Sequence, residues 1–247
     1  MVKVAAIQMS MSEDKVSNVL KAKRLLREAA LGGAQIILLP ELFEGLYFCK
    51  DMDEQYFSWA KPLGRNPLIA EFRELALELE VVVLVSYFEK ADDGYFNSLV
   101  VVDADGSVMD NYRKTHIPDG PGYEEKFYFK PGNSGFKVYE TAFGKIGVGI
   151  CWDQWFCETA RALTLMGAEI IFYPTAIGSE PEIHVDSKEH WQRVQMGHAA
   201  TNTVPVVVAN RYGEEKGASC SLNFYGSSFI TDYTGQKIAE ASREKEE

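Results

Sequence analysis

Metal-binding and nucleotide-binding motifs are missing from this 247-residue sequence. Its four histidines form no HExxH motif and its four cysteines form no CxxC pair, although zinc sites commonly use these spacings. No serine lies in a GxSxG motif, no GxGxxG motif follows an apolar strand, and the run GVGIC lacks the lysine of a phosphate-binding loop. We therefore expect no metal site and no cofactor.

Long hydrophobic runs and secretion signals are also absent. No apolar run approaches the ~20 residues that a membrane span needs, and the N-terminal MVKVAAIQMS has no basic region followed by a long apolar segment. The cysteines Cys49, Cys151, Cys157 and Cys220 show no spacing typical of a disulfide framework. We expect a reducing, cytoplasmic location and no membrane partner.

Positive charge is in short supply. The chain has 25 lysines and arginines against 36 aspartates and glutamates, which gives a formal net charge of -11. Such a surface repels nucleic acid and attracts cations. We expect no nucleic-acid partner, and cationic small molecules are plausible substrates.

Apolar residues are plentiful enough for a sizeable core. They make up 46% of the chain without a break in composition, so we predict one domain over residues 1–247. Apolar runs predict strands, and 3.6-residue periodicity with capping residues predicts helices. The predicted strands lie at residues 2–9, 34–40, 81–88, 97–103, 107–114, 136–141, 145–150, 169–174 and 204–210, with a hairpin around 232–237. The predicted helices lie at residues 13–31, 67–79, 158–166 and 188–202, and an ordered loop occupies 115–135.

The order of these elements favours a layered α/β fold. Several strands are apolar at consecutive positions, which is typical of strands covered on both faces. The adjoining strands between the βα units make the sheets mixed. In the helix at residues 13–31, we expect Val16, Val19, Ala22, Leu26 and Ala29 to share one face.

Three residues with complementary chemistry follow predicted strands. Glu41 comes after IILLP, Lys114 after NYR and Cys151 after GVGI. Ligands of open α/β sheets bind beyond the carboxyl ends of strands, so these side chains could converge on one cleft. A carboxylate base, a thiol nucleophile and an ammonium beside the oxyanion make a complete set for acyl transfer.

Each of the three residues also has a structural explanation. A buried cysteine is commonly a packing residue, a glutamate after proline can cap a turn, and a lysine can be a solvated charge. A pair of Cys151 with His116 is another possible arrangement, although packing or a hydrogen bond within the loop is the role we expect for His116. The similar position of all three groups at strand ends brings the catalytic interpretation level with the structural one, so both stay open at this point.

In their contexts LLPELF, YRKTHIP and GVGICWD, these three residues resemble the nitrilase superfamily of carbon-nitrogen hydrolases. The likeness covers nearly the whole chain. It implies an α/β fold of the αββα sandwich type, with Glu41 as general base, Lys114 as oxyanion donor and Cys151 as nucleophile. The segment YEEKFYF matches the second glutamate of the family at Glu125.

Longer stretches resemble the N-carbamoylputrescine amidases within that superfamily. These stretches are RKTHIPDGPGYEEKFYFKPG, CWDQWF, IFYPTAIGSEP and HWQRVQMGHAATNTVPVVVANR. The resemblance implies hydrolysis of the terminal ureido C–N bond of N-carbamoylputrescine to putrescine, carbon dioxide and ammonia. Trp152 would add its backbone N–H at the reacting carbonyl, and Asp119 and Glu180 are candidates to bind the distal ammonium, although either could instead cap a turn.

The sequence departs from this superfamily in two places. Cys157 stands where relatives commonly have proline, and we expect it to be a small apolar filler. Relatives continue beyond the position of Glu247 with a strand and an arm, so we expect that arm to be short or absent. The resemblance also implies a homodimer or a larger homo-oligomer.

Two other functions remain open from the sequence. One is a β-ureidopropionase or an ω-amidase, whose substrate ends in a carboxylate and would need a basic residue at the distal end. The other is an inactive relative that serves as a binding subunit, although the complete Glu41, Lys114 and Cys151 set speaks against it.

Overall fold

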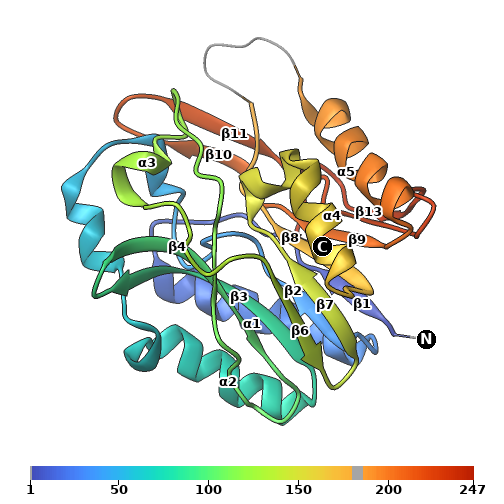
Figure 1. Ribbon diagram of the computed structural model, residues 1–247. Helices are drawn as coiled ribbons and strands as arrows, with labels where there is room; N and C mark the ends of the chain where they lie inside the picture. Colours follow the sequence, from blue (N-terminus) through green and yellow to red (C-terminus); the bar gives the residue numbers. More distant parts are fainter. Residues whose placement is uncertain (1, 180–185) are drawn as a thin grey trace.

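The computed structural model describes residues 2–179 and 186–247 as four stacked layers. Figure 1 shows helices α1 (Lys15–Leu31) and α2 (Pro67–Leu79) along one outer side of the molecule. Helices α4 (Cys157–Leu165) and α5 (Lys188–Asn202) lie along the other, with two β-sheets between the helical layers. The predicted αββα sandwich is confirmed.

Both sheets are mixed, as predicted. The first has the order β1-β2-β3-β4-β5, in which β1 to β3 are parallel and β3 to β5 antiparallel. Its strands are β1 (Val4–Ala6), β2 (Ile36–Leu38), β3 (Val82–Ala91), β4 (Gly94–Val102) and β5 (Tyr112–Arg113).

The second sheet has the order β13-β12-β9-β8-β7-β6, with a parallel centre of β7, β8 and β9. Its strands are β6 (Lys137–Thr141), β7 (Gly144–Val148), β8 (Ile170–Pro174), β9 (Val206–Ala209), β12 (Phe229–Thr231) and β13 (Lys237–Glu240). The predicted hairpin around residues 232–237 joins β12 to β13.

Consecutive apolar residues occur in the central strands because both faces of each sheet are covered. In β2, Ile36 and Leu38 belong to the apolar cluster between the two sheets, whereas Ile37 belongs to the cluster under α1 and α2. In β9, Val207 faces the other sheet and Val208 packs with residues of α4 and α5. The period of two along each strand thus divides its side chains between two cores.

The predicted helices agree closely with the structure, apart from one exposed residue on the apolar face of α1. Asp14 caps α1 by accepting a hydrogen bond from the backbone N–H of Val16, at 3.0 Å. On the predicted apolar face, Ala22 and Leu26 are buried and Val19 and Ala29 are partly buried, whereas Val16 is exposed. The buried residues of α1 are Asn18, Ala22, Leu25 and Leu26. Among the described residues, no helix is both long and apolar enough to cross a bilayer.

Some predicted boundaries were wrong. The predicted strand at residues 107–114 is reduced to β5 and a single bridge between Val102 and Val108. The predicted loop at 115–135 contains a short helix, α3 (Glu125–Tyr128). An unpredicted hairpin pairs β10 (Tyr212–Lys216) with β11 (Ser221–Tyr225). Short 3-10 helices, also unpredicted, are η1 (Phe48–Lys50), η2 (Glu54–Trp59), η3 (Leu63–Arg65) and η4 (Cys151–Trp155).

The alternating glycines before Cys151 allow close packing on the outer face of the second sheet. A Cβ atom at Gly147 would lie 3.1 Å from the Cβ of Leu163 in α4, and one at Gly149 would lie 2.6 Å from Cε1 of Tyr173. Val148 and Ile150 point into the core between the sheets. The glycines therefore bring α4 and the Tyr173 ring against the segment that carries Cys151.

We expect Gly149→Ala to destabilise the protein by about 1–3 kcal/mol, because the new methyl group overpacks against Tyr173. Urea unfolding followed by circular dichroism measures this change. The control is Gly64→Ala, because a Cβ at Gly64 meets no atom within 4 Å. Equal stabilities of the two variants would contradict the packing explanation.

Candidate active site

The three predicted residues converge although they come from different strands. Glu41 follows β2, Lys114 follows β5 and Cys151 follows β7. Glu41 is fully buried, Lys114 is 1% exposed and Cys151 is 5% exposed. The backbone N–H of Glu41 donates to the carbonyl of Thr175, which follows β8, so the strand ends of the two sheets meet here.

Lys114 lies between two buried carboxylates. Its Nζ donates to Glu41 Oε1 at 2.8 Å, to Glu125 Oε1 at 2.9 Å and to Glu125 Oε2 at 2.7 Å. The structure thus brings the predicted Glu125, at the start of α3, to the same centre. Tyr47 donates its hydroxyl to Glu125 Oε1 and Asn97 donates its side-chain N–H to Glu41 Oε1, each at 2.7 Å.

One oxygen of this cluster is available for proton transfer. Glu41 Oε2 is buried and has no hydrogen-bond partner within residues 2–179 and 186–247. An unpaired carboxylate oxygen in the interior is costly, so such atoms commonly mark a place for a ligand or a water molecule. Glu41 can therefore accept a proton without giving up its bond to Lys114.

The charges in the cluster oppose the effect of burial on Lys114. Burial alone would lower the pKa of Lys114, but the neighbouring Glu125 and Glu41 hold that pKa well above its usual value. Burial raises the pKa of Glu125, an effect that Lys114 opposes and Glu41 reinforces. The neighbouring carboxylates therefore favour the ammonium form of Lys114.

Cys151 begins the 3-10 helix η4 with a left-handed backbone conformation, at a φ of 42°. Residues with a Cβ adopt this conformation at a cost, and they are concentrated at functional sites. Asp153 supports the turn: it is fully buried and accepts hydrogen bonds from the backbone N–H of Ile150 at 2.9 Å and from the hydroxyl of Tyr112 at 2.7 Å. The His116 ring also bonds to Asp153, at 2.7 Å, and stacks on Phe156.

The thiol of Cys151 is protonated at neutral pH. Burial raises its pKa well above the usual value, Glu41 adds to this effect, and Lys114 opposes it. The thiolate is the nucleophilic form, so an attack by Cys151 requires a base to remove the proton.

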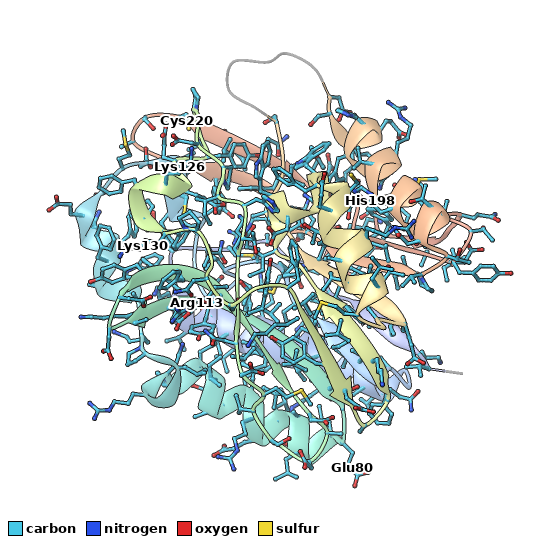
Figure 2. The ribbon with its side chains drawn as sticks, viewed as in Figure 1. Glu80, Arg113, Lys126, Lys130, His198 and Cys220 are labelled. Atoms are coloured by element: carbon cyan, nitrogen blue, oxygen red, sulfur yellow. The ribbon has the colours of Figure 1, made fainter. Side chains whose placement is uncertain are left out.

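A cavity of about 140 Å³ opens onto Cys151. The predicted Asp119 and Trp152 line it, together with Pro118, Gly120, Pro121, Tyr123, Ala176 and Ile177. Asp119 is half exposed and pairs at 3.5 Å with Lys126 of α3. Figure 2 labels Lys126 at this short helix. The predicted Glu180 lies outside the described residues.

Two cysteines outside the cluster differ from each other in exposure. Cys157 is exposed at the first position of α4, so its predicted role as an apolar filler is wrong. Cys49 is fully buried, and burial together with Glu125 and Glu41 raises its pKa well above the usual value. Across the described ranges 2–179 and 186–247, no three His, Cys, Asp or Glu side chains are placed to hold a metal ion.

Sequence reasoning missed the residues that orient the cluster. Asn97 gives a weak sequence signal, because it is a polar residue directly before the apolar run SLVVV. In the structure its side chain is fully buried. Tyr47 has no local signal, since its hydroxyl partner lies 78 positions further along the chain.

The chain resembles known proteins in both its sequence and its fold. The family model described as carbon-nitrogen hydrolase matches residues 3–247. An N-carbamoylputrescine amidase from Arabidopsis thaliana is 54% identical, over 98% of this chain and 83% of its own length. A citrullinase from Francisella tularensis is 51% identical, over 98% of this chain and 85% of its own.

A solved structure supports the same relationship. The crystal structure of a carbon-nitrogen hydrolase from Helicobacter pylori G27 superposes with a TM-score of 0.92 at 36% sequence identity. The match covers 99% of this chain and 86% of that one.

The raised pKa of Cys151 leads to a prediction for the resting thiol. In ultraviolet absorbance titration, the difference between the wild type and Cys151→Ser should show no thiolate at neutral pH, and the signal should appear only above the ordinary thiol pKa of about 8.5. The thiolate signal should shift to higher pH because a raised pKa favours the neutral thiol. A thiolate already present near pH 7 would contradict it and would indicate a resting ion pair with Lys114.

Proposed function

The chain belongs to the carbon-nitrogen hydrolase family, and we propose that it hydrolyses the terminal ureido group of N-carbamoylputrescine through a covalent intermediate on Cys151. The observation that carries this proposal is the cavity that joins Cys151 to the carboxylate of Asp119. The lining of this cavity offers both a nucleophile for a carbonyl and a negative charge for an ammonium group.

The first half of the reaction forms a bond between sulfur and carbon. Glu41 takes the thiol proton through its free Oε2 as Sγ attacks the ureido carbonyl carbon. Lys114 and the backbone N–H of Trp152 stabilise the oxyanion. The terminal C–N bond then breaks, Glu41 returns the proton to the leaving nitrogen, and ammonia departs.

The second half of the reaction uses water. Cys151 now carries an S-carbamoyl group that retains the alkyl amine, and Glu41 removes a proton from the attacking water. The C–S bond breaks and Cys151 recovers its proton. The released carbamic acid decomposes to carbon dioxide and putrescine.

Glu125 acts through Lys114. It bonds to the ammonium with both oxygens and is itself held by Tyr47, so it fixes where the Lys114 Nζ lies. Glu125 also supplies charge that keeps Lys114 protonated. Its proposed role is to orient the oxyanion donor.

The chemistry of the cavity mouth favours a cationic substrate. Asp119 is the only charged residue among the described residues that line the cavity, and the aromatic residues Trp152 and Tyr123 line it as well. A carboxylate and aromatic faces are suited to an alkylammonium group. Glu180 remains a second candidate for this contact.

A second candidate function is hydrolysis of the ureido group of L-citrulline. The Francisella tularensis relative carries the name citrullinase, and Lys126 lies 3.5 Å from Asp119. An α-amino acid presents an ammonium beside a carboxylate, which the Asp119 and Lys126 pair could receive with opposite charges. N-carbamoylputrescine would instead compete with Lys126 for Asp119.

The proposal also covers the location, the assembly and the cofactor requirement of the protein. We propose a cytoplasmic enzyme, because a free nucleophilic thiol is preserved in a reducing compartment. We also propose that the chain assembles as a homodimer or a larger homo-oligomer, and that its single domain works without a cofactor.

Ammonia release from N-carbamoylputrescine, L-citrulline and N-carbamoyl-β-alanine is the direct test. We expect the wild type to favour N-carbamoylputrescine, Cys151→Ala to abolish turnover, and Glu41→Gln to lower kcat by about 10²–10⁴-fold through loss of the base. Preference for N-carbamoyl-β-alanine would contradict the cationic substrate. Full activity of Cys151→Ala would contradict the covalent mechanism.

The pair at the cavity mouth separates the two candidate substrates. We expect Asp119→Asn to raise KM for N-carbamoylputrescine about fivefold, because a half-exposed ion pair contributes a binding free energy of about this size. Lys126→Met should lower KM for N-carbamoylputrescine, because Asp119 loses its competing partner, and raise KM for L-citrulline. Steady-state kinetics on both substrates measure these shifts. The proposed zwitterion contact is wrong if Lys126→Met shifts both KM values in the same direction.

A further inference from the structure

A fully buried arginine holds the turn that carries Glu41. Arg211 lies between β9 and β10, and its Nη2 donates to the carbonyl of Glu41 at 2.6 Å and to that of Leu42 at 3.2 Å. Its Nη1 donates to the carbonyl of Gly45 at 3.3 Å and to Glu215 Oε1 at 2.8 Å. One guanidinium thus binds three backbone carbonyls of a single turn.

That turn needs an external partner to keep its shape. Leu42 has a left-handed backbone at a φ of 48°, a conformation that residues with a Cβ seldom adopt. The Leu42 N–H donates to the hydroxyl of Ser86, and Arg211 satisfies the Leu42 carbonyl. Without the guanidinium, the Glu41 carbonyl would lose the Arg211 donor and the Leu42 carbonyl would keep only the Gly45 N–H, at 3.5 Å, so the turn could relax.

Glu215 connects Arg211, through Tyr47, to Glu125, the second carboxylate that binds Lys114. Its Oε1 pairs with Arg211, and its Oε2 accepts the backbone N–H of Tyr47 at 2.5 Å. Tyr47 in turn donates its hydroxyl to Glu125 at 2.7 Å. The guanidinium also lies 5.7 Å from the centre of the Tyr47 ring. Arg211 and Glu215 are therefore connected to both carboxylates that flank Lys114.

Stability alone is a poor explanation for this pair. Glu215 is 2% exposed, and the desolvation of two buried charges commonly offsets their attraction, so apolar residues often serve as well. An apolar pair, however, could not donate to the carbonyls of Glu41 and Leu42 or accept from the N–H of Tyr47. These backbone contacts are what the charged pair provides.

We propose that Arg211 and Glu215 form a positioning pair that sets where Glu41 and Glu125 lie around Lys114. The pair contacts the backbone of Glu41 and of Tyr47, neither of which lines the cavity, so we expect it to act on the chemical step rather than on substrate binding. The proposal rests on the proposed function to the extent that it takes Glu41 as the base for Cys151.

The test compares Arg211→Lys and Glu215→Gln with the wild type and with Arg27→Lys. Arg27 makes a similar arginine–glutamate contact with Glu78, but it joins α1 to α2 on the surface. In each variant, chloroacetamide labelling and peptide mass spectrometry count the reactive Cys151 sites. The rate of that labelling and the steady-state kinetics are then expressed per reactive site.

We expect Arg211→Lys to lower both kcat per site and the labelling rate of Cys151 by about 10²-fold, because displacement by an ångström has effects of this size. KM should change less than twofold, and Arg27→Lys should match the wild type. A purely structural role would reduce the number of reactive sites but leave kcat and the labelling rate per site unchanged, and that result would overturn the proposal.

Poor folding of a variant does not remove the test. The double variant Arg211→Met with Glu215→Leu leaves no unpaired charge and should also fold with slow labelling of Cys151. Labelling at the wild-type rate in this variant would overturn the positioning role. The labelling rate needs no substrate, so a wild type that ignores N-carbamoylputrescine would refute the proposed function while the labelling comparison still decides the role of Arg211.

Discussion

The site depends on one ammonium group held between two buried carboxylates. Lys114 is the shared donor of Glu41 and Glu125, and each carboxylate would be difficult to keep in the interior without it. The same arrangement accounts for the neighbouring thiol. Burial and Glu41 outweigh the attraction of Lys114, so Cys151 stays protonated until the base acts. The proposed chemistry is therefore a proton transfer coupled to attack, in place of a preformed thiolate.

The fold supplies this arrangement by joining two sheets at their strand ends. Glu41 and Lys114 follow strands of the first sheet, and Cys151 follows a strand of the second. The apolar cluster between the sheets fixes their separation. Polar contacts then complete the alignment, since Asp153 holds the turn at Cys151 and Arg211 reaches from the second sheet to the turn at Glu41. Rigid strands set the coarse positions, and buried hydrogen bonds set the fine ones.

Much of this could be predicted from local sequence. Apolar residues on consecutive strand positions predicted sheets covered on both faces, and Glu41, Lys114 and Cys151 stand directly at strand ends. The family resemblance added Glu125, and the family is confirmed by the matching family model. The proposed roles of these residues stay predictions, as does the single domain.

The remaining features depend on contacts between distant parts of the chain. Arg211 contacts a turn 170 positions away, and nothing in the segment ANRYGEE indicates that partner. The β10 and β11 hairpin was missed because Gly213, Glu214 and Lys216 give β10 no clear apolar alternation. Val16 fits the helical period of α1, yet its side chain is exposed, and the period alone does not show which turns of a helix are covered.

The covalent intermediate is the central claim, and rapid acid quenching followed by mass spectrometry tests it most directly. During turnover of N-carbamoylputrescine, the account predicts a Cys151 peptide heavier by the substrate less one ammonia. Under the same conditions, Cys49, Cys157 and Cys220 should remain unmodified. An adduct on another residue, or turnover in which Cys151 stays unmodified even when a slower-reacting ureido substrate is used, would contradict the account.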